Sequence, residues 1–367
     1  MAQVRNGQWW GGLALAVLVA FAAGYAAVWV GESVLGFAKS PISDIMMAII
    51  IGMVIANTVT LPEGVRDGLR FCASTILRLG IMLLGIRLSL LGAGRFTLVA
   101  LPFVVVAIGV GLITVRFLGQ RLGLSRQLSG LIAVGTSICG ATAIVATAPL
   151  IRAREAEVSY AIACITVFGL VAMFCYPYVG HWLFADQPAM AGLFLGTSIH
   201  ETAQVAGAGM MYEAQYQSPV ALDIATVTKL VRNLCMIAVI PLVGFLYASE
   251  GKAASDKRVS LWSMVPWFII GFAAMSALRT VGDLGDRPFG FLAPEVWDGT
   301  VSWLRSAAEH FLLIAMAAVG LTSMFAGLRE IGPRPFLLGM LAAALIGAVS
   351  LLMIATLAPT MFRLLGV

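Results

Sequence analysis

Charged residues are scarce in this sequence. Only 11% of the 367 residues are Asp, Glu, Lys or Arg, whereas a water-soluble domain carries about 25%. Hydrophobic residues make up 60% of the chain, and the mean hydropathy is +0.97. The apolar residues fall into blocks of about 20, the length that a helix needs to cross a bilayer. The composition therefore excludes a water-soluble globular protein and predicts an all-α polytopic membrane protein.

Familiar ligand motifs are lacking as well. The five cysteines lie in apolar segments and show neither a CxxC pair nor a Cys/His spacing that binds zinc. The run from His200 to Gln204 is not a HExxH motif. We therefore expect no structural disulfide, no metal and no cofactor. The net charge of +5 comes mainly from Lys and Arg in short loops, where they set membrane orientation, so we also expect no nucleic-acid partner.

The apolar blocks predict nine spanning helices. The first has interfacial tryptophans and is longer than the apolar region of a signal peptide, about 7–15 residues, so it is predicted to be a retained extra N-terminal span. The predicted spans lie near residues 10–31, 42–59, 71–92, 96–117, 158–180, 219–247, 261–280, 300–326 and 335–362.

Two further segments, 127–151 and 189–213, have a different composition. Both are rich in Gly, Ser, Thr and Ala, and each has a polar cluster in its middle. They share the motif GTSI, at 135–138 in the first and at 196–199 in the second. The pattern predicts a helix that is interrupted near the centre of each segment.

The helices that follow the two motifs also match, through Pro177 and Pro241. The chain is therefore predicted to contain a first repeat at 42–180 and a second, circularly shifted in order, at 189–362. Internal duplication of this kind is typical of secondary transporters, whose inverted halves meet at a site near the membrane midplane.

The distribution of arginine favours re-entrant hairpins for the interrupted segments. Arg116, Arg121 and Arg126 precede the first segment, and Arg152 and Arg154 follow it. Since Lys and Arg accumulate in cytoplasmic loops, both groups share the cytoplasm only if the segment enters and leaves on one face. We therefore predict nine spans plus two opposed hairpins in an inner (cell) membrane. Eleven spans, including two broken helices, are the alternative.

The two interruptions are the predicted binding site. Irregular backbone at membrane depth is tolerated only where protein or a wet cavity shields its N–H and C=O groups. Helix N-termini exposed there offer N–H donors and a partial positive charge that suit an anion. The alternative is that these small residues serve only close helix packing, but the duplication favours a site. Hydroxyl groups come from Ser137, Thr142, Ser198 and Thr202.

Charged residues within the predicted membrane segments are the second signal, because they are costly unless paired or solvated. Lys229 and Arg232 are three residues apart and share a helix face. We expect these cations to balance an anionic substrate. Glu201 is expected to carry a coupling proton or to neutralise a cation, and His200 to relay protons. A structural His–Glu hydrogen bond is the alternative.

Other polar residues in the spans admit two interpretations. Arg87 either reaches an interface by snorkelling or takes part in function. Glu309 and His310 face either the site or an outer interface. Secondary candidates, for which helix–helix hydrogen bonding is favoured, are Asn57, Asn233, Gln204 and Asp223.

Four runs of residues carry a family resemblance. They are GTSICGATAIVATAPLIRA (135–153), LGTSIHETAQVAGAG (195–209), ATVTKLVRN (225–233) and IIIGMVIAN (49–57). With them the chain resembles the YeiH-type bacterial membrane proteins over nearly its whole length. The resemblance implies a secondary transporter distantly related to the cation/proton antiporter and anion transporter superfamily. It also implies export of sulfate or a related sulfur oxyanion, with matching positions at Ser137, Cys139, Ser198, His200, Glu201, Lys229 and Arg232.

The sequence thus predicts alternating access by an anion exporter that is driven by a proton or cation gradient and is not an enzyme. An anion channel is the nearest rival. An intramembrane enzyme is another, with Cys139 or Ser198 near His200 as its candidate nucleophile and base. The oligomeric state is left undecided by the sequence, and a homodimer is a common assembly for transporters. The predicted substrate site consists of Ser137, Ile138, Cys139, Gly140, Thr142, Ser198, Ile199, His200, Glu201, Thr202, Lys229 and Arg232, and the predicted coupling residues are Glu201 and His200.

Overall fold

The computed structural model describes residues 7–36, 40, 42–248, 266–285, 287–324 and 332–365. Within these ranges every regular element is helical, which confirms the predicted all-α class. Seven helices are long and apolar enough to cross a membrane, and the shorter helices Asp44–Thr58 and Trp267–Gly282 are also apolar. Each of the nine predicted segments overlaps one of these helices, although the first residues of the predicted 261–280 segment lie outside the described residues. The number of crossings stays a prediction.

The chain divides into two compact units. Unit 1 comprises Met1–Ala93, Met210–Pro219 and Trp267–Ala326. Unit 2 comprises Gly94–Gly209, Val220–Pro266 and Gly327–Val367. Each unit draws segments from both predicted repeats, so the units do not coincide with the repeats.

Unit 1 is a bundle of long helices in which α1 packs on α2 and α3, and α14 packs on α1, α2 and α4. Helix α3 continues through the π-helical turn η3 into α4, which ends in the 3-10 turn η4. We call this continuous helix the third rod. The elements of unit 1 are α1 Gly7–Val28 with η2 Trp29–Val34, α2 Asp44–Thr58, α3 Glu63–Phe71, η3 Cys72–Ile76, α4 Leu77–Leu84, η4 Gly85–Arg87, α13 Trp267–Gly282, η6 Pro288–Gly290 and α14 Pro294–Thr322.

Helices α2 and α14 cross in backbone contact. A Cβ atom on Gly52 would lie 2.7 Å from the carbonyl oxygen of Ala317 and from the amide nitrogen of Leu321. Gly320 meets the backbone of Ile49 in the same way. Since lipid is as apolar as these side chains, close backbone approach at small residues is what holds such helices together.

The third rod begins earlier than its predicted start at 71. Its first turns carry Glu63, Arg66, Asp67 and Arg70. Because these residues are charged, a search for apolar blocks does not find this part of the helix.

Helix α2 begins at a serine cap. The hydroxyl oxygen of Ser43 accepts a hydrogen bond from the Met46 N–H at 3.2 Å, as is typical of serine at this position.

The rod also ends before the predicted residue 92. Ser89 starts the next helix there, because its hydroxyl oxygen accepts from the Gly92 N–H at 3.0 Å and its carbonyl accepts from the Ala93 N–H at 2.9 Å. The predicted span 96–117 is therefore longer in the structure, where α5 covers Leu90–Arg121.

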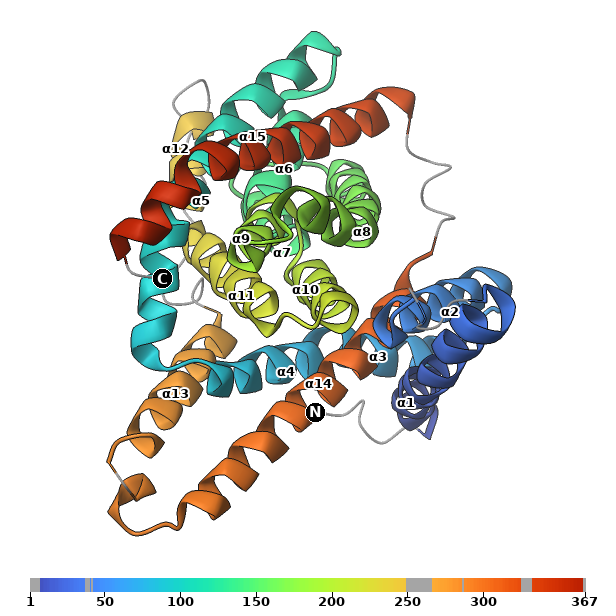
Figure 1. Ribbon diagram of the computed structural model, residues 1–367. Coiled ribbons are helices and arrows are strands. Elements are labelled where there is room, and N and C mark those ends of the chain that lie inside the picture. The colour runs from blue at the N-terminus through green and yellow to red at the C-terminus, as the bar shows by residue number, and fades with distance from the viewer. Residues whose placement is uncertain are drawn as a thin grey trace. The chain divides into compact units, whose positions relative to one another are not determined.

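The short helices α6, α7 and α9 lie in the interior of unit 2, beside the long helices α8 and α15 (Figure 1). Both α8 and α15 pack on α6 and on α9. The elements that contribute to this unit are α5 Leu90–Arg121, α6 Arg126–Ser137, α7 Ala141–Thr147, α8 Glu155–Phe184, α9 Pro188–Ser198, α10 Thr202–Tyr216, α11 Pro219–Leu234, α12 Met236–Ala248 and α15 Pro333–Leu365.

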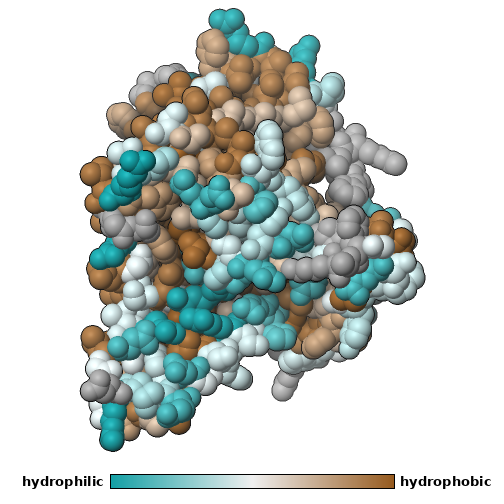
Figure 2. Space-filling view, viewed as in Figure 1, coloured by the Kyte–Doolittle hydropathy of each residue, from teal (hydrophilic) through white to brown (hydrophobic). Residues whose placement is uncertain are grey.

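The surface of the protein is rich in large apolar side chains. Tyr25, Trp182 and Ile113 are more than 70% exposed, and Figure 2 shows apolar residues over broad areas of the visible face. A water-soluble protein rarely exposes contiguous apolar areas of this extent, so the surface fits lipid as the surrounding medium.

Candidate functional site

The first predicted interruption lies at Ile138–Gly140, between α6 and α7. Gly140 has φ +71°, a conformation that favours glycine because other residues bring Cβ into a clash. A Cβ atom at this position would also lie 3.2 Å from Glu201 Oε1. Gly140 therefore permits both the break in the first segment and the close approach of the second.

The second predicted interruption lies at Ile199–Glu201, between α9 and α10. Ile199 is extended and ends α9. The Glu201 N–H donates to Gln204 Oε1 at 3.2 Å, and Gln204 Nε2 donates to the Thr166 carbonyl at 3.2 Å. Gln204 thus caps the start of α10 and ties it to α8.

Lys229 of α11 joins the two interruptions. Its side chain is fully buried, and its ammonium group donates only to backbone carbonyl oxygens in the hydrogen bonds that the structure describes. The acceptors are Ile138 at 2.9 Å, Ile199 at 3.2 Å and His200.

Arg232 lies one helical turn later and makes the same kind of contact. Its guanidinium group is fully buried and donates to carbonyls at the ends of both α6 and α9. Nε donates to Ser137 at 2.7 Å, Nη1 donates to Thr197 and Ile199 at 2.9 Å each, and Nη2 donates to Thr136.

These contacts satisfy the carbonyls that a helix leaves free at its C-terminus. Inside a membrane such groups have no water to bind, and the negative end of the helix dipole favours a cation. The predicted shared face of Lys229 and Arg232 is present. Because backbone carbonyls accept hydrogen bonds from nearly all of their donors, the two side chains hold the interruptions in place.

Glu201 and His200 lie in the second interruption. The Glu201 carboxylate accepts from the Ala141 N–H and, at 3.4 Å, from the Thr166 hydroxyl. The His200 ring hydrogen bonds to the Thr136 carbonyl, while its Nδ1 atom is buried without a partner. Each residue of the His–Glu pair therefore contacts the first interrupted segment.

Several buried polar atoms near the interruptions lack a hydrogen-bond partner. Ser198 Oγ, His200 Nδ1 and Asn233 Oδ1 belong to side chains that are at most 3% exposed. Ser137 Oγ is also unpartnered, but it faces α5, where it would meet a Cβ atom on Gly111. Since buried polar groups are normally paired, the first three atoms are candidates for contact with a ligand or water.

Comparison with known proteins assigns the chain to a family. A family model described as conserved hypothetical protein 698 matches residues 11–339. The chain is 35% identical to a UPF0324 membrane protein of Oceanobacillus iheyensis over 317 residues, which is 84% of this chain and 87% of that protein. The chain belongs to the UPF0324 family. It is also 31% identical to a UPF0324 membrane protein of Bordetella bronchiseptica, over 82% of this chain and 90% of that protein.

A third UPF0324 membrane protein, from Bacillus anthracis, is 32% identical over 338 residues, or 90% of each chain. These relatives and the seven long apolar helices make the protein a multi-pass membrane protein of bacteria. The family is consistent with the YeiH-type resemblance.

The remaining predicted site residues of this UPF0324 protein do not all lie together. Cys139 is buried, and its Sγ lies 2.9 Å from Met236 Sδ. Thr202 Oγ1 accepts from Asn233 Nδ2 at 3.1 Å. Thr142 is exposed and does not join the buried polar atoms.

Thr166 is a contact of the site that the sequence did not reveal. It is a single threonine in the long apolar helix α8, and neither its neighbours nor its spacing distinguish it from a packing residue. Gln204 and Asn233 were secondary candidates, and both lie at the second interruption.

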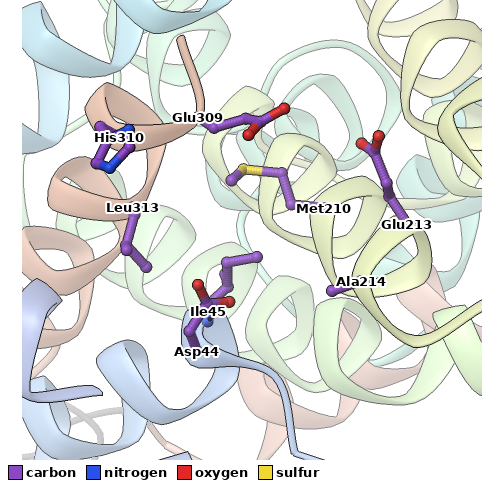
Figure 3. Close-up of a pocket in the computed structure, with 8 residues that line it drawn as sticks. All are labelled: Asp44, Ile45, Met210, Glu213, Ala214, Glu309, His310 and Leu313. Atoms are coloured by element: carbon purple, nitrogen blue, oxygen red, sulfur yellow. Dashed lines mark hydrogen bonds between the residues drawn. The ribbon is translucent and has the colours of Figure 1, made fainter. Parts of the chain in front are cut away.

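A second polar cluster lies in unit 1. Arg87 pairs with Glu213 through two hydrogen bonds of 2.6 and 3.1 Å and lies 3.7 Å from Glu309. Its side chain is only 6% exposed, so it pairs with carboxylates instead of snorkelling. Beside it is a cavity of about 290 Å³ that is lined by Asp44, Glu213, Glu309 and His310, among others (Figure 3).

Proposed function

We propose that this UPF0324 protein is a secondary active transporter that exports a small anion by alternating access. The proposed substrate class is sulfate or a related sulfur oxyanion. The observation that carries the proposal is that two interrupted helices meet around Lys229 and Arg232. Interrupted helices that meet deep in the membrane are where secondary transporters bind their substrates.

The charges around the interruptions support an anionic substrate. Neutral carbonyls solvate Lys229 and Arg232, and among the described residues no salt bridge joins either cation to a carboxylate. Glu201 is the acidic side chain of the interruptions and interacts electrostatically with Lys229. Two cations facing one carboxylate leave a net charge of +1. A dianion would balance both cations when Glu201 is protonated, which makes Glu201 the proposed site of the coupling proton.

Direct contacts with the anion are assigned to unpartnered polar groups. Ser198 Oγ can donate. The His200 ring already donates to the Thr136 carbonyl, so its Nδ1 atom donates to an anion only when the ring carries a second proton. Lys229 and Arg232 supply mainly the field, because carbonyls use their donors. No hydrogen bond joins Ser198 Oγ to His200 Nδ1, since both atoms lack a partner, and this favours a carrier over a hydrolase.

Uptake of radiolabelled sulfate into inside-out vesicles tests the proposal, because exporters load such vesicles. Because the dianion and the proton bind together, we expect an acidic outer buffer to stimulate uptake in the wild type. Glu201→Gln should abolish the stimulation by this gradient while the amount of protein stays unchanged. The matched control is Glu155→Gln, which changes an exposed carboxylate at the start of α8 and should transport normally. Normal gradient-driven uptake by Glu201→Gln would contradict the assignment of the coupling site.

Counterflow in proteoliposomes separates a carrier from a channel. A carrier accumulates external labelled sulfate when the lumen holds unlabelled sulfate, and the rate saturates. Single-channel currents in planar bilayers, without saturable counterflow, would overturn alternating access.

A further inference from the structure

A cavity in unit 2, separate from the interruptions, has an apolar part and a basic end. It lies between α5, α6 and α12 and has a volume of about 360 Å³. Most of its lining side chains are apolar, including Ile113, Leu242 and Leu246, and among the described lining residues none is acidic.

The basic end is organised around one aromatic ring. The guanidinium carbon of Arg116 lies 5.1 Å from the centroid of the Tyr247 ring, and that of Arg126 lies 4.4 Å from it. The Tyr247 hydroxyl donates to the Arg126 carbonyl at 2.9 Å. Two positive charges are thus held on one ring, next to the lining residue Gln120.

The lining of the cavity changes from polar to apolar along the helices that form it. The polar residues lie close to the ends of these helices, since α5 ends at Arg121, α6 begins at Arg126 and α12 ends at Ala248. The apolar lining residues Leu112 and Val134 lie about two helical turns further in. The cavity is therefore basic near the membrane–water interface and apolar at greater depth.

The apolar part faces outward. Ile113 is 74% exposed and Leu242 is 51% exposed, on two helices that belong to candidate membrane spans. The molecule that meets these side chains is therefore lipid, and an acyl chain can enter the cavity from the bilayer.

We propose that this cavity binds one anionic phospholipid of the phosphatidylglycerol class. An acyl chain lies along Ile113 and Leu242, and the phosphate lies beside Arg116 and Arg126. Charge complementarity decides for an anionic lipid over a zwitterionic one. Basic pockets between membrane helices bind anionic headgroups in this way. The cavity contacts α6, which ends at the first interruption, so the lipid supports a helix whose terminal carbonyls accept from Arg232.

Native mass spectrometry of the purified full-length protein tests the site. Phosphatidylglycerol and phosphatidylethanolamine with identical acyl chains would be added at equal concentration, and the bound fraction of each measured. We expect phosphatidylglycerol to be retained preferentially. Arg116→Gln and Arg126→Gln should each weaken its retention about fivefold, and the double variant about 25-fold. Arg116→Lys keeps the charge and should retain most of the binding, which separates loss of charge from loss of fold.

Two controls sharpen the result. Arg121→Gln removes the same charge from the same helix, but Arg121 stacks on Phe117 and not on the Tyr247 ring that holds Arg116 and Arg126, so retention should change less than twofold. Ile113→Trp fills the apolar part and should reduce phosphatidylglycerol binding with both arginines intact. Equal retention of the two lipids, or wild-type retention by the double variant, would overturn the proposal. Displacement by inorganic phosphate alone at millimolar concentration would also overturn it, because the site would then recognise phosphate without the acyl chain.

Discussion

The two units bury positive charge in opposite ways. In unit 1, Arg87 is paired with Glu213 and lies near Glu309, so carboxylates cancel its charge. In unit 2, Lys229 and Arg232 donate to backbone carbonyls. A carbonyl solvates a cation without neutralising it, because it contributes a dipole and no net charge.

The difference assigns different roles to the two clusters. The pair in unit 1 leaves its neighbouring cavity acidic, since Glu309 and Asp44 also line it. In the proposed site of unit 2, two basic side chains face the single carboxylate of Glu201 where the two interrupted helices meet. An anion is therefore expected in unit 2 and not in the unit 1 cavity.

The largest effect is expected from Arg232→Leu. This change leaves carbonyls at the ends of α6 and α9 without donors inside the protein, and we expect it to cost at least about 4 kcal/mol. Little monodisperse protein should be recovered on size-exclusion chromatography in detergent. Arg232→Lys should recover part of it. A leucine variant that melts at the wild-type temperature would show that the carbonyls do not need this cation.

A double-mutant cycle at Arg87 and Glu213 should give the next largest effect. Arg87→Met or Glu213→Met alone leaves one charge without its main partner and should each cost about 3 kcal/mol. The double variant should regain much of the loss, because it removes both charges. Thermal unfolding in detergent measures all four proteins. Additive losses would mean that the pair is not coupled, and the contrast with unit 2 would fail.

Gly140→Ala tests the geometry of the first interruption. The positive φ and the closeness of Glu201 should make alanine cost about 2 kcal/mol. The control is Gly109→Ala, in the helix α5, where nothing lies within 4 Å of a new Cβ atom and alanine is favoured by helix propensity. If the two variants have the same unfolding midpoint, the strained break is not required.

The smallest effect is expected at a surface pair of unit 1. Partial burial raises the pKa of Asp283, but hydrogen bonds from Trp297 and Arg279 and the charges of Arg279 and Arg305 outweigh it and hold the pKa below its ordinary value. A lowered pKa contributes stability above the unfolded-state value, about 3.9, and that stability is lost as the pH falls through the folded value.

Asp283→Asn should therefore lower stability by less than about 1 kcal/mol at pH 7, and the difference should shrink below about pH 4. Unfolding midpoints of the two proteins between pH 7 and pH 3 measure this. A difference that grows toward acid pH would reverse the assigned sign.

Much of the site could be predicted from the sequence, because its signals are local. The GTSI motifs located both interruptions, and the spacing of Lys229 and Arg232 placed them on one face. Their acceptors could not be predicted, since every residue carries a carbonyl and only the fold selects which ones lie at a broken helix end. Thr142 was expected at the site, but its side chain is exposed. Its orientation depends on the backbone turn at Gly140, which the sequence alone does not specify.

Long-range pairing limited the prediction in unit 1. Arg87 could be a snorkelling residue or a functional one, because Glu213 and Glu309 lie far away in the sequence. The start of the third rod at Glu63 was also missed, because the first turns of α3 are charged and do not form an apolar block. The number of crossings and the inverted relation of the repeats stay predictions, since they concern the membrane and not the helices themselves.

Binding of an anion to purified protein tests most directly whether the carbonyl-solvated cations of unit 2 form an anion site. Melting temperatures would be measured in sulfate, sulfite and chloride at one ionic strength, for the wild type and for Ser198→Ala. At about 100 times its Kd, a specific oxyanion should raise the melting temperature of the wild type by roughly 5 °C, with a smaller shift for the variant. Identical melting in all anions would contradict the account.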